Sequence, residues 1–195
     1  MKRMHRLIFF MVPVLLLLGC RHTEAPAISE DTPPIPPEDL SALGRVLAKG
    51  GDPFFELAAL DAKALLAGPF GKEMMDWAMK AAETEFIPET THALYGEFQR
   101  SGIRDTYQKP YFAKRTLLTQ EVVRVWIGGD DSRMGRVNDL IWSICEESTW
   151  VVPAHYKGPD TIDLFSAETA TQLSAVLMVL KDRLPEDIRS RIQSE

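Results

Sequence analysis

The sequence predicts an all-α protein made of antiparallel helical hairpins. After residue 40, apolar residues recur three and four positions apart, which is the spacing of one helix face. Gly and Pro interrupt these runs at short intervals, and no run alternates between apolar and polar residues as a strand does. Helices joined by short turns lie as antiparallel neighbours, so the architecture is a bundle, a solenoid or an α/α toroid. The absence of a fixed repeat disfavours the solenoid.

The first 19 residues read as the signal peptide of a bacterial lipoprotein. Basic residues precede an apolar run at 7–18, which is shorter than the about 20 residues that span a bilayer. The run ends in Leu17-Leu18-Gly19-Cys20, which resembles a lipobox, the motif cut before its cysteine. We therefore expect lipid attachment at Cys20 and anchoring to a membrane through it.

Residues 20–39 are expected to be a tether between the lipid and a folded domain. Five prolines and no apolar periodicity are typical of an extended spacer. Arg21 follows the anchor, where an aspartate would indicate retention in the inner membrane. We expect a lipid-anchored protein of the bacterial cell envelope, in the outer membrane.

Residues 40–195 are expected to form one helical domain, with four helices in its first part. The apolar spacing predicts them at 40–47, 54–67, 74–81 and 92–100. Glycines close the first, second and fourth of these runs, and an Asp-Pro pair begins the second.

The second part of the domain continues in the same way. Helices are predicted at 117–126 and 134–144, separated by a Gly-Gly pair. After a break around Pro153, the run at 163–184 is the longest, and a new helix begins near Pro185.

Charge, cysteine and histidine content exclude several classes of function. The chain has 22 Lys and Arg against 28 Asp and Glu. The signal peptide contains basic but no acidic residues, so its removal makes the net charge more negative, and we expect no nucleic-acid partner. Cys145 has no partner for a disulfide once Cys20 is lipidated, and its apolar neighbours predict that it is packed inside. The four histidines lack metal-ligand spacing, so neither a metal nor another cofactor is expected.

The loop that follows the helix at 134–144 is the main candidate site. It brings Trp150, His155 and Tyr156 close in sequence to Glu147, a combination of aromatic and titratable groups suited to gripping a sugar ring. The alternative is structural: Trp150 packs in the core, His155 caps a backbone carbonyl, and the glutamates are solvated.

A basic segment precedes this loop. Between residues 100 and 124, six basic residues stand against Asp105 and Glu121, and Arg104 is one of the six. Guanidinium groups here could contact the carboxylates or sulfates of a glycan, and the alternative is an ordinary solvated helix surface.

Several separated motifs resemble one family. They are Ile144-Cys145-Glu146-Glu147, Trp150, Pro153-Ala154-His155, Asp163-Leu164-Phe165, Glu168-Thr169-Ala170, and upstream Tyr95, Phe98, Arg100, Gly102, Arg104 and Tyr107. In this order they are similar to the heparinase II/III-like proteins, over residues 92–195.

The resemblance implies an incomplete α/α toroid from a polysaccharide lyase that cleaves uronic-acid-containing glycans by β-elimination. The Asn, His and Tyr residues that perform elimination in the family lie beyond the helices present here, so no catalytic residue is assigned in this chain. An acidic polysaccharide or oligosaccharide is the expected partner, contacted by Trp150, His155, Tyr156, Glu147 and Arg104. The alternative is a non-catalytic helical lipoprotein that binds a glycan or an envelope protein.

Overall fold

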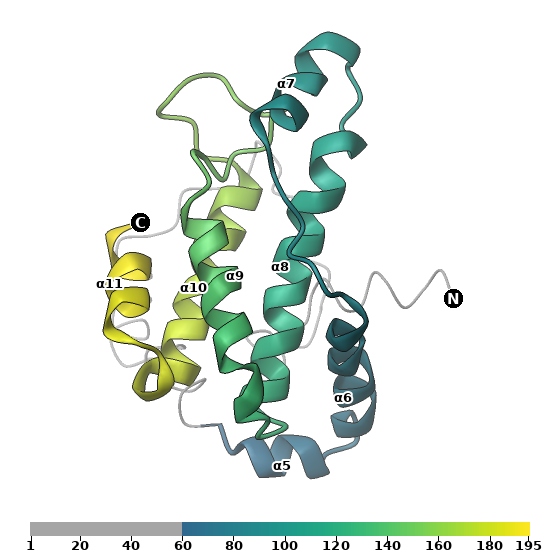
Figure 1. Cartoon of the computed structure of the whole chain (residues 1–195), viewed down its shortest axis with the longest axis vertical. Coiled ribbons are helices and arrows are strands. Elements are labelled where there is room, and N and C mark those ends of the chain that lie inside the picture. Colours follow the sequence, from purple (N-terminus) through teal and green to yellow (C-terminus); the bar gives the residue numbers. More distant parts are fainter. Residues whose placement is uncertain (1–59) are drawn as a thin grey trace, which may run out of the picture. The chain divides into compact units, whose positions relative to one another are not determined.

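All regular structure in the described part of the chain is helical. The computed structural model describes residues 60–195, and within them every element is an α-helix or a short 3-10 helix (Figure 1). The predicted all-α class is therefore confirmed. The signal peptide, Cys20, the tether and the helix predicted at 40–47 lie outside the described residues. The helix predicted at 54–67 is described only over its last turns.

The elements follow one another in short steps along the chain. The α-helices are α5 (Ala62–Ala67), α6 (Gly71–Met79), α7 (His92–Ser101), α8 (Asp105–Trp126), α9 (Met134–Cys145), α10 (Leu164–Leu180) and α11 (Glu186–Ser194). The 3-10 helices are η1 (Lys80–Glu83), η2 (Asp131–Arg133) and η3 (Lys181–Arg183).

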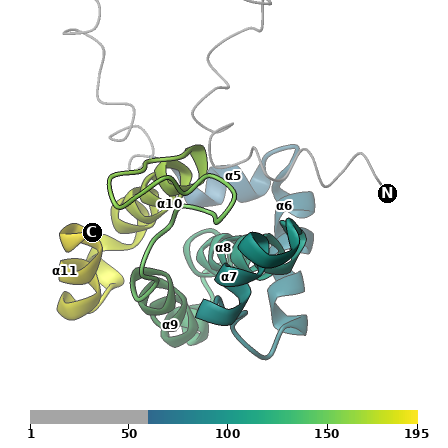
Figure 2. The same cartoon turned by 90° about the horizontal axis from the view of Figure 1, so that it is seen from above.

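Helix α8 is the centre of this arrangement. It packs against α6, α7, α9 and α10, and the view along its axis shows these helices around it (Figure 2). The sequence predicted a helix from residue 117, whereas α8 begins at Asp105 and runs for 22 residues. The early turns were missed because they carry aromatic and charged residues, and because Pro110, inside the helix, cannot donate a hydrogen bond to the preceding turn.

The hydrophobic core lies between α8, α9, α10 and α11. Its fully or nearly fully buried members include Leu118, Val125, Val137, Leu140, Ile141, Ile144, Leu173, Val176, Leu180 and Ile188. Cys145 belongs to the same cluster, as predicted. Burial raises the pKa of its thiol to about 11, so it stays protonated and unreactive at neutral pH.

A buried carboxylate joins the C-terminal half of α8 to the start of α9. The Glu121 side chain is fully buried and accepts hydrogen bonds from Arg124 at 3.4 Å and from Arg133 Nε at 3.0 Å. Arg136 lies 3.2 Å from the same carboxylate. A charge without access to water needs such partners, because an unpaired buried charge is strongly unfavourable.

The helix ends next to the candidate site are capped by local side chains and by one glycine. Thr91 caps α7 through Leu94 N, and Gly102 ends that helix at a φ of 70°, a conformation that favours glycine. Asp163 and Ser166 form a capping box at the start of α10. This box fixes where the loop from α9 rejoins the helices.

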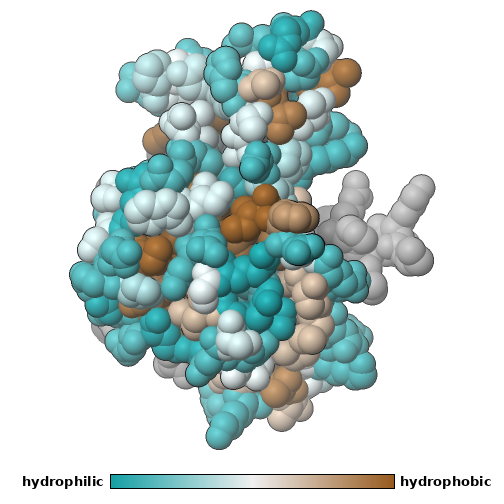
Figure 3. Space-filling model, in the orientation of Figure 1, coloured by the Kyte–Doolittle hydropathy of each residue, from teal (hydrophilic) through white to brown (hydrophobic). Residues whose placement is uncertain are grey.

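The surface is mostly polar. On the face shown in Figure 3, hydrophobic residues form small separated patches among hydrophilic ones. No helix within residues 60–195 is both long and apolar enough to cross a membrane.

Candidate functional site

The loop between α9 and α10 is held against α8 by a buried tyrosine. The Tyr111 hydroxyl lies 2.8 Å from the carbonyl of Trp150, 3.2 Å from that of Phe165 and 3.1 Å from Thr169 Oγ1. Burial raises the pKa of Tyr111 to about 12, so the neutral phenol keeps its proton to donate. Tyr111 of α8 thus contacts Trp150 near the start of the loop and Phe165 just after its end.

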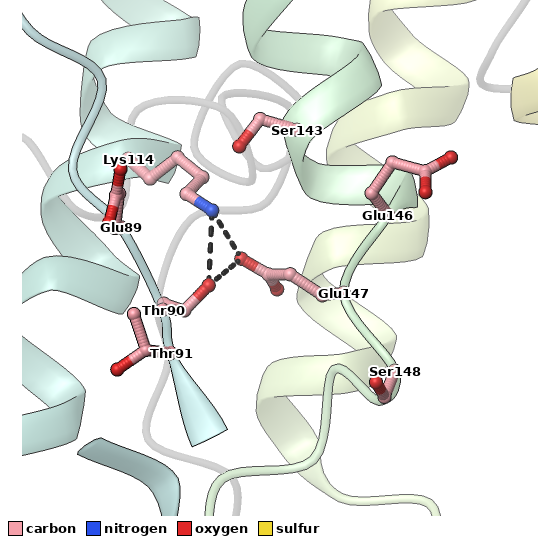
Figure 4. A pocket seen from close by; sticks show the side chains of 8 residues that line it. All are labelled: Glu89, Thr90, Thr91, Lys114, Ser143, Glu146, Glu147 and Ser148. Carbon is pink, nitrogen blue, oxygen red and sulfur yellow. Dashed lines mark hydrogen bonds and ion pairs between the residues drawn. The ribbon is translucent and has the colours of Figure 1, made fainter. Parts of the chain in front are cut away.

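Glu147 is placed at the start of the loop as a buried ion-pair partner. It accepts from Lys114 Nζ at 2.9 Å and from Thr90 Oγ1 at 2.9 Å (Figure 4). It also accepts from Arg115 Nη2 at 2.8 Å. Its side chain is 5% exposed, with Lys114 and Arg115 similarly buried. This candidate binding residue is therefore neither solvated nor free to pair with an incoming anion.

Trp150 packs inward. Its indole nitrogen donates to the carbonyl of Ile144 at 2.9 Å, and its ring lies against the hydrophobic core. The same carbonyl also accepts from the backbone N–H of Glu147 at 3.2 Å, so the indole is a second donor at the C-terminal end of α9. This placement matches the structural alternative considered for Trp150.

His155 and Asp163 form a pair on the outer side of the loop. His155 Nδ1 lies 2.9 Å from Asp163 Oδ2, and the imidazole stacks on Phe165 with centroids 5.5 Å apart. Burial acts to raise the pKa of Asp163, but hydrogen bonds from Ser166, His155 and the Val152 backbone outweigh it and hold the pKa below its ordinary value. The ionised Asp163 accepts from Nδ1–H of His155, which leaves Nε2 for another partner.

Tyr156 is exposed beside this pair. Its side chain is 41% exposed, and its ring meets that of Tyr95 edge to face at 6.2 Å. Tyr95 donates its hydroxyl to the carbonyl of Val151. Burial, with smaller contributions from Tyr156 and Asp163, raises the pKa of Tyr95, so it acts as a donor and not as a base.

The rings on both sides of the loop belong to one continuous series of contacts. Neighbouring rings are 4.9 to 6.2 Å apart, in the range of favourable aromatic pairs. In order they are Tyr156, Tyr95, Tyr107, Tyr111, Phe112, Phe165 and His155. We call His155, Tyr156, Tyr95 and Asp163 the aromatic loop site.

The six basic residues of residues 100–124 differ in burial and in ion pairing. Lys114, Arg115 and Arg124 are buried and paired with carboxylates. Arg100 and Lys109 form exposed ion pairs on their own helices. Arg104 is exposed just before α8, and within residues 60–195 its side chain has no ion pair.

Two members of the aromatic loop site were missed by sequence reasoning. Asp163 carries a recognisable signal, because an aspartate before an apolar run is a typical N-cap, but nothing in the sequence joins it to His155. Tyr95 comes from α7, 60 residues upstream of His155, so only the fold brings the two together. The described residues contain no cluster of three or more metal-ligating side chains.

Comparison with known proteins adds no relative: no family model matches the chain, and no curated protein matches it. The fold and site define only a class of protein, an all-α domain in which a loop packed against the central helix carries a half-buried histidine and an exposed tyrosine.

Proposed function

We propose that this chain is the helical, glycan-binding part of a lipid-anchored polysaccharide lyase of the heparinase II/III-like kind. The observation that carries the proposal is the aromatic loop site, where Tyr156 is exposed and His155 keeps Nε2 free beside the ionised Asp163. In this proposal the helices belong to an α/α toroid, and Cys20 anchors the protein in the outer membrane.

The chemistry of the site suits a sugar. An exposed tyrosine ring can stack on the apolar face of a pyranose. An imidazole whose Nδ1–H donates to Asp163 can accept a hydrogen bond from a sugar hydroxyl at Nε2.

Arg104 supplies a guanidinium at the same end of the domain. The start of α8 and the loop between α9 and α10 lie at one end of the helices in Figure 1. Without an ion pair of its own among the described residues, Arg104 can bind a carboxylate or sulfate with two parallel hydrogen bonds.

Binding of the glycan alone does not accelerate elimination, because only interactions that are stronger with the transition state than with the bound substrate raise the rate. A lyase also needs a base that removes the C5 proton and an acid for the leaving oxygen. The proposal assigns these roles to the Asn, His and Tyr residues that the resemblance puts outside these helices.

The test uses the purified full chain in detergent with oligosaccharides of heparan sulfate, hyaluronan and alginate. Calorimetry should detect binding of at least one, and ultraviolet absorbance should detect no unsaturated product. Tyr156→Ala and His155→Ala should each weaken binding about tenfold, the effect of about 1.4 kcal/mol. Phe70→Ala, which removes an exposed ring at the other end of the domain, should not.

Failure to bind any of the three glycans would overturn the proposal. Turnover by the chain alone would instead move the elimination chemistry into it, with Tyr156→Phe as the variant that should abolish activity. Binding that survives both loop substitutions would place the glycan elsewhere on the molecule.

A further inference from the structure

A polar cleft borders Glu147, and its lining contains neither His155 nor Tyr156. It lies between the segment at 84–91, helix α8 and the C-terminal end of α9, and its volume is about 290 Å³ (Figure 4). This is near the lower limit of small-molecule sites, so it fits one sugar unit better than a long chain.

Lys114 lines this cleft with a hydrogen-bond donor to spare. Its side chain is 3% exposed, and Nζ donates to Thr90 Oγ1 at 3.1 Å and to Glu147 Oε1 at 2.9 Å. An ammonium group has three N–H donors, so these two acceptors within the described residues leave one donor. A buried donor without an acceptor is energetically unfavourable. A ligand oxygen that accepts a hydrogen bond from this third N–H would remove that cost.

Further hydroxyl and carboxylate groups line the same cleft. Thr91, Ser143 and Ser148 contribute hydroxyls to the lining, and Glu89 and Glu146 contribute carboxylates. Sugar hydroxyls both donate and accept, so one can accept from Lys114 while donating to a carboxylate.

The charge of the cleft selects against an acidic ligand. The lining contains one ammonium, Lys114, and three carboxylates, Glu89, Glu146 and Glu147. Glu147 is already paired with Lys114 and, from outside the lining, with Arg115. Arg191 lies 3.5 Å from Glu146 but leaves that side chain 55% exposed. A uronate or sulfate here would meet like charges, which is unfavourable for binding.

An exposed tryptophan is close in sequence to two of the lining residues. Trp142 is 46% exposed on α9, directly before Ser143 and one helical turn before Glu146. Residues four apart lie on one face of a helix, and exposed indole rings commonly stack on sugar rings.

We propose that this polar cleft is a second binding site, which takes a neutral, hydroxyl-rich sugar unit. Lys114 donates its remaining N–H to the sugar, Ser143 and Glu146 bind its hydroxyls, and Trp142 borders it. The cleft contains none of the residues of the aromatic loop site and has the opposite charge preference, so this proposal does not depend on the binding of acidic glycans.

The experiment is an NMR titration of the full chain in a detergent that has no sugar headgroup. The probes are glucose, N-acetylglucosamine and their β-1,4-linked disaccharides, with glucuronic acid as the charged comparison. We expect neutral sugars to shift the amide signals of Thr90 and Ser143, and glucuronic acid to bind there at least about fivefold more weakly.

Substitutions of Ser143 and Glu146, which we call the rim of the cleft, test the proposed sugar site without disturbing the buried ion pairs of Glu147. Ser143→Ala and Glu146→Gln should each weaken neutral-sugar binding about fivefold or more, whereas Ser174→Ala, on the exposed side of α10, should not. The proposal is overturned if neutral sugars leave the Thr90 and Ser143 signals unchanged, if both rim variants bind like the wild type, or if glucuronic acid binds equally well. Signals of His155 and Tyr156 report separately on the aromatic loop site.

Discussion

Arg115 lies over the face of the Tyr111 ring, with its guanidinium carbon 3.3 Å from the ring centroid. The same guanidinium donates to Thr169 Oγ1 at 2.7 Å and pairs with Glu147. Tyr111 in turn holds the loop through the carbonyls of Trp150 and Phe165. This stacked pair connects the buried carboxylate on one side of the loop to the aromatic loop site on the other.

Substitutions of the neighbouring residues Glu146 and Glu147 should differ sharply in their effect on the free energy of unfolding. Glu147→Gln leaves Lys114 and Arg115 buried without a counter-charge, so we expect the free energy of unfolding to fall by about 3 kcal/mol. Glu146→Gln changes an exposed side chain and should stay within about 0.5 kcal/mol. Urea unfolding followed by circular dichroism measures both, and equal losses would contradict the structural role of Glu147.

Tyr111→Phe should loosen the loop while preserving the ring packing. It leaves the carbonyl of Trp150 without its 2.8 Å donor, and an unsatisfied buried group costs about 1 to 3 kcal/mol. Hydrogen exchange of the backbone at 151–163 should accelerate. Tyr156→Phe is the matched control, because Tyr156 is 41% exposed. This substitution should leave the free energy of unfolding within about 0.5 kcal/mol of the wild type.

The helices were predictable from the sequence because their apolar faces repeat, whereas the buried charges were not. Lys114 and Glu121 lie seven residues apart on α8, on the stripe that also contains Tyr111, Leu118 and Val125. Charged side chains are rarely buried unless paired, and their partners come from other elements. The spacing was visible in the sequence, but only the fold reveals the pairing.

Asp163 should make the free energy of unfolding depend on pH. Its pKa is lower in the folded protein than the ordinary 3.8, so the ionised carboxylate stabilises the fold above that pH, and the contribution is lost as pH falls through the lower folded value. We expect Asp163→Asn to be less stable than the wild type at pH 7, with the difference shrinking below about pH 4. A constant difference from pH 7 to pH 2 would contradict this assignment.

Cys20 is predicted to attach the protein to the membrane. Cys20→Ser should move the protein from the membrane fraction to the soluble fraction, because acyl chains supply the anchoring and the tether has no apolar face. Fractionation followed by a salt wash measures the change. Cys145→Ser is the control, since that thiol is buried and should not affect attachment.

Three buried contacts close chain segments of very different length. Glu121 reaches Arg133 over 12 residues, whereas Glu147 reaches Lys114 over 33 and Tyr111 reaches Thr169 over 58. Closing the longest of these segments costs about 1.4 kcal/mol more in chain entropy than closing the shortest. During refolding we therefore expect the turn between α8 and α9 to form first and the loop to dock last, so that the aromatic loop site is completed only in the final step of folding.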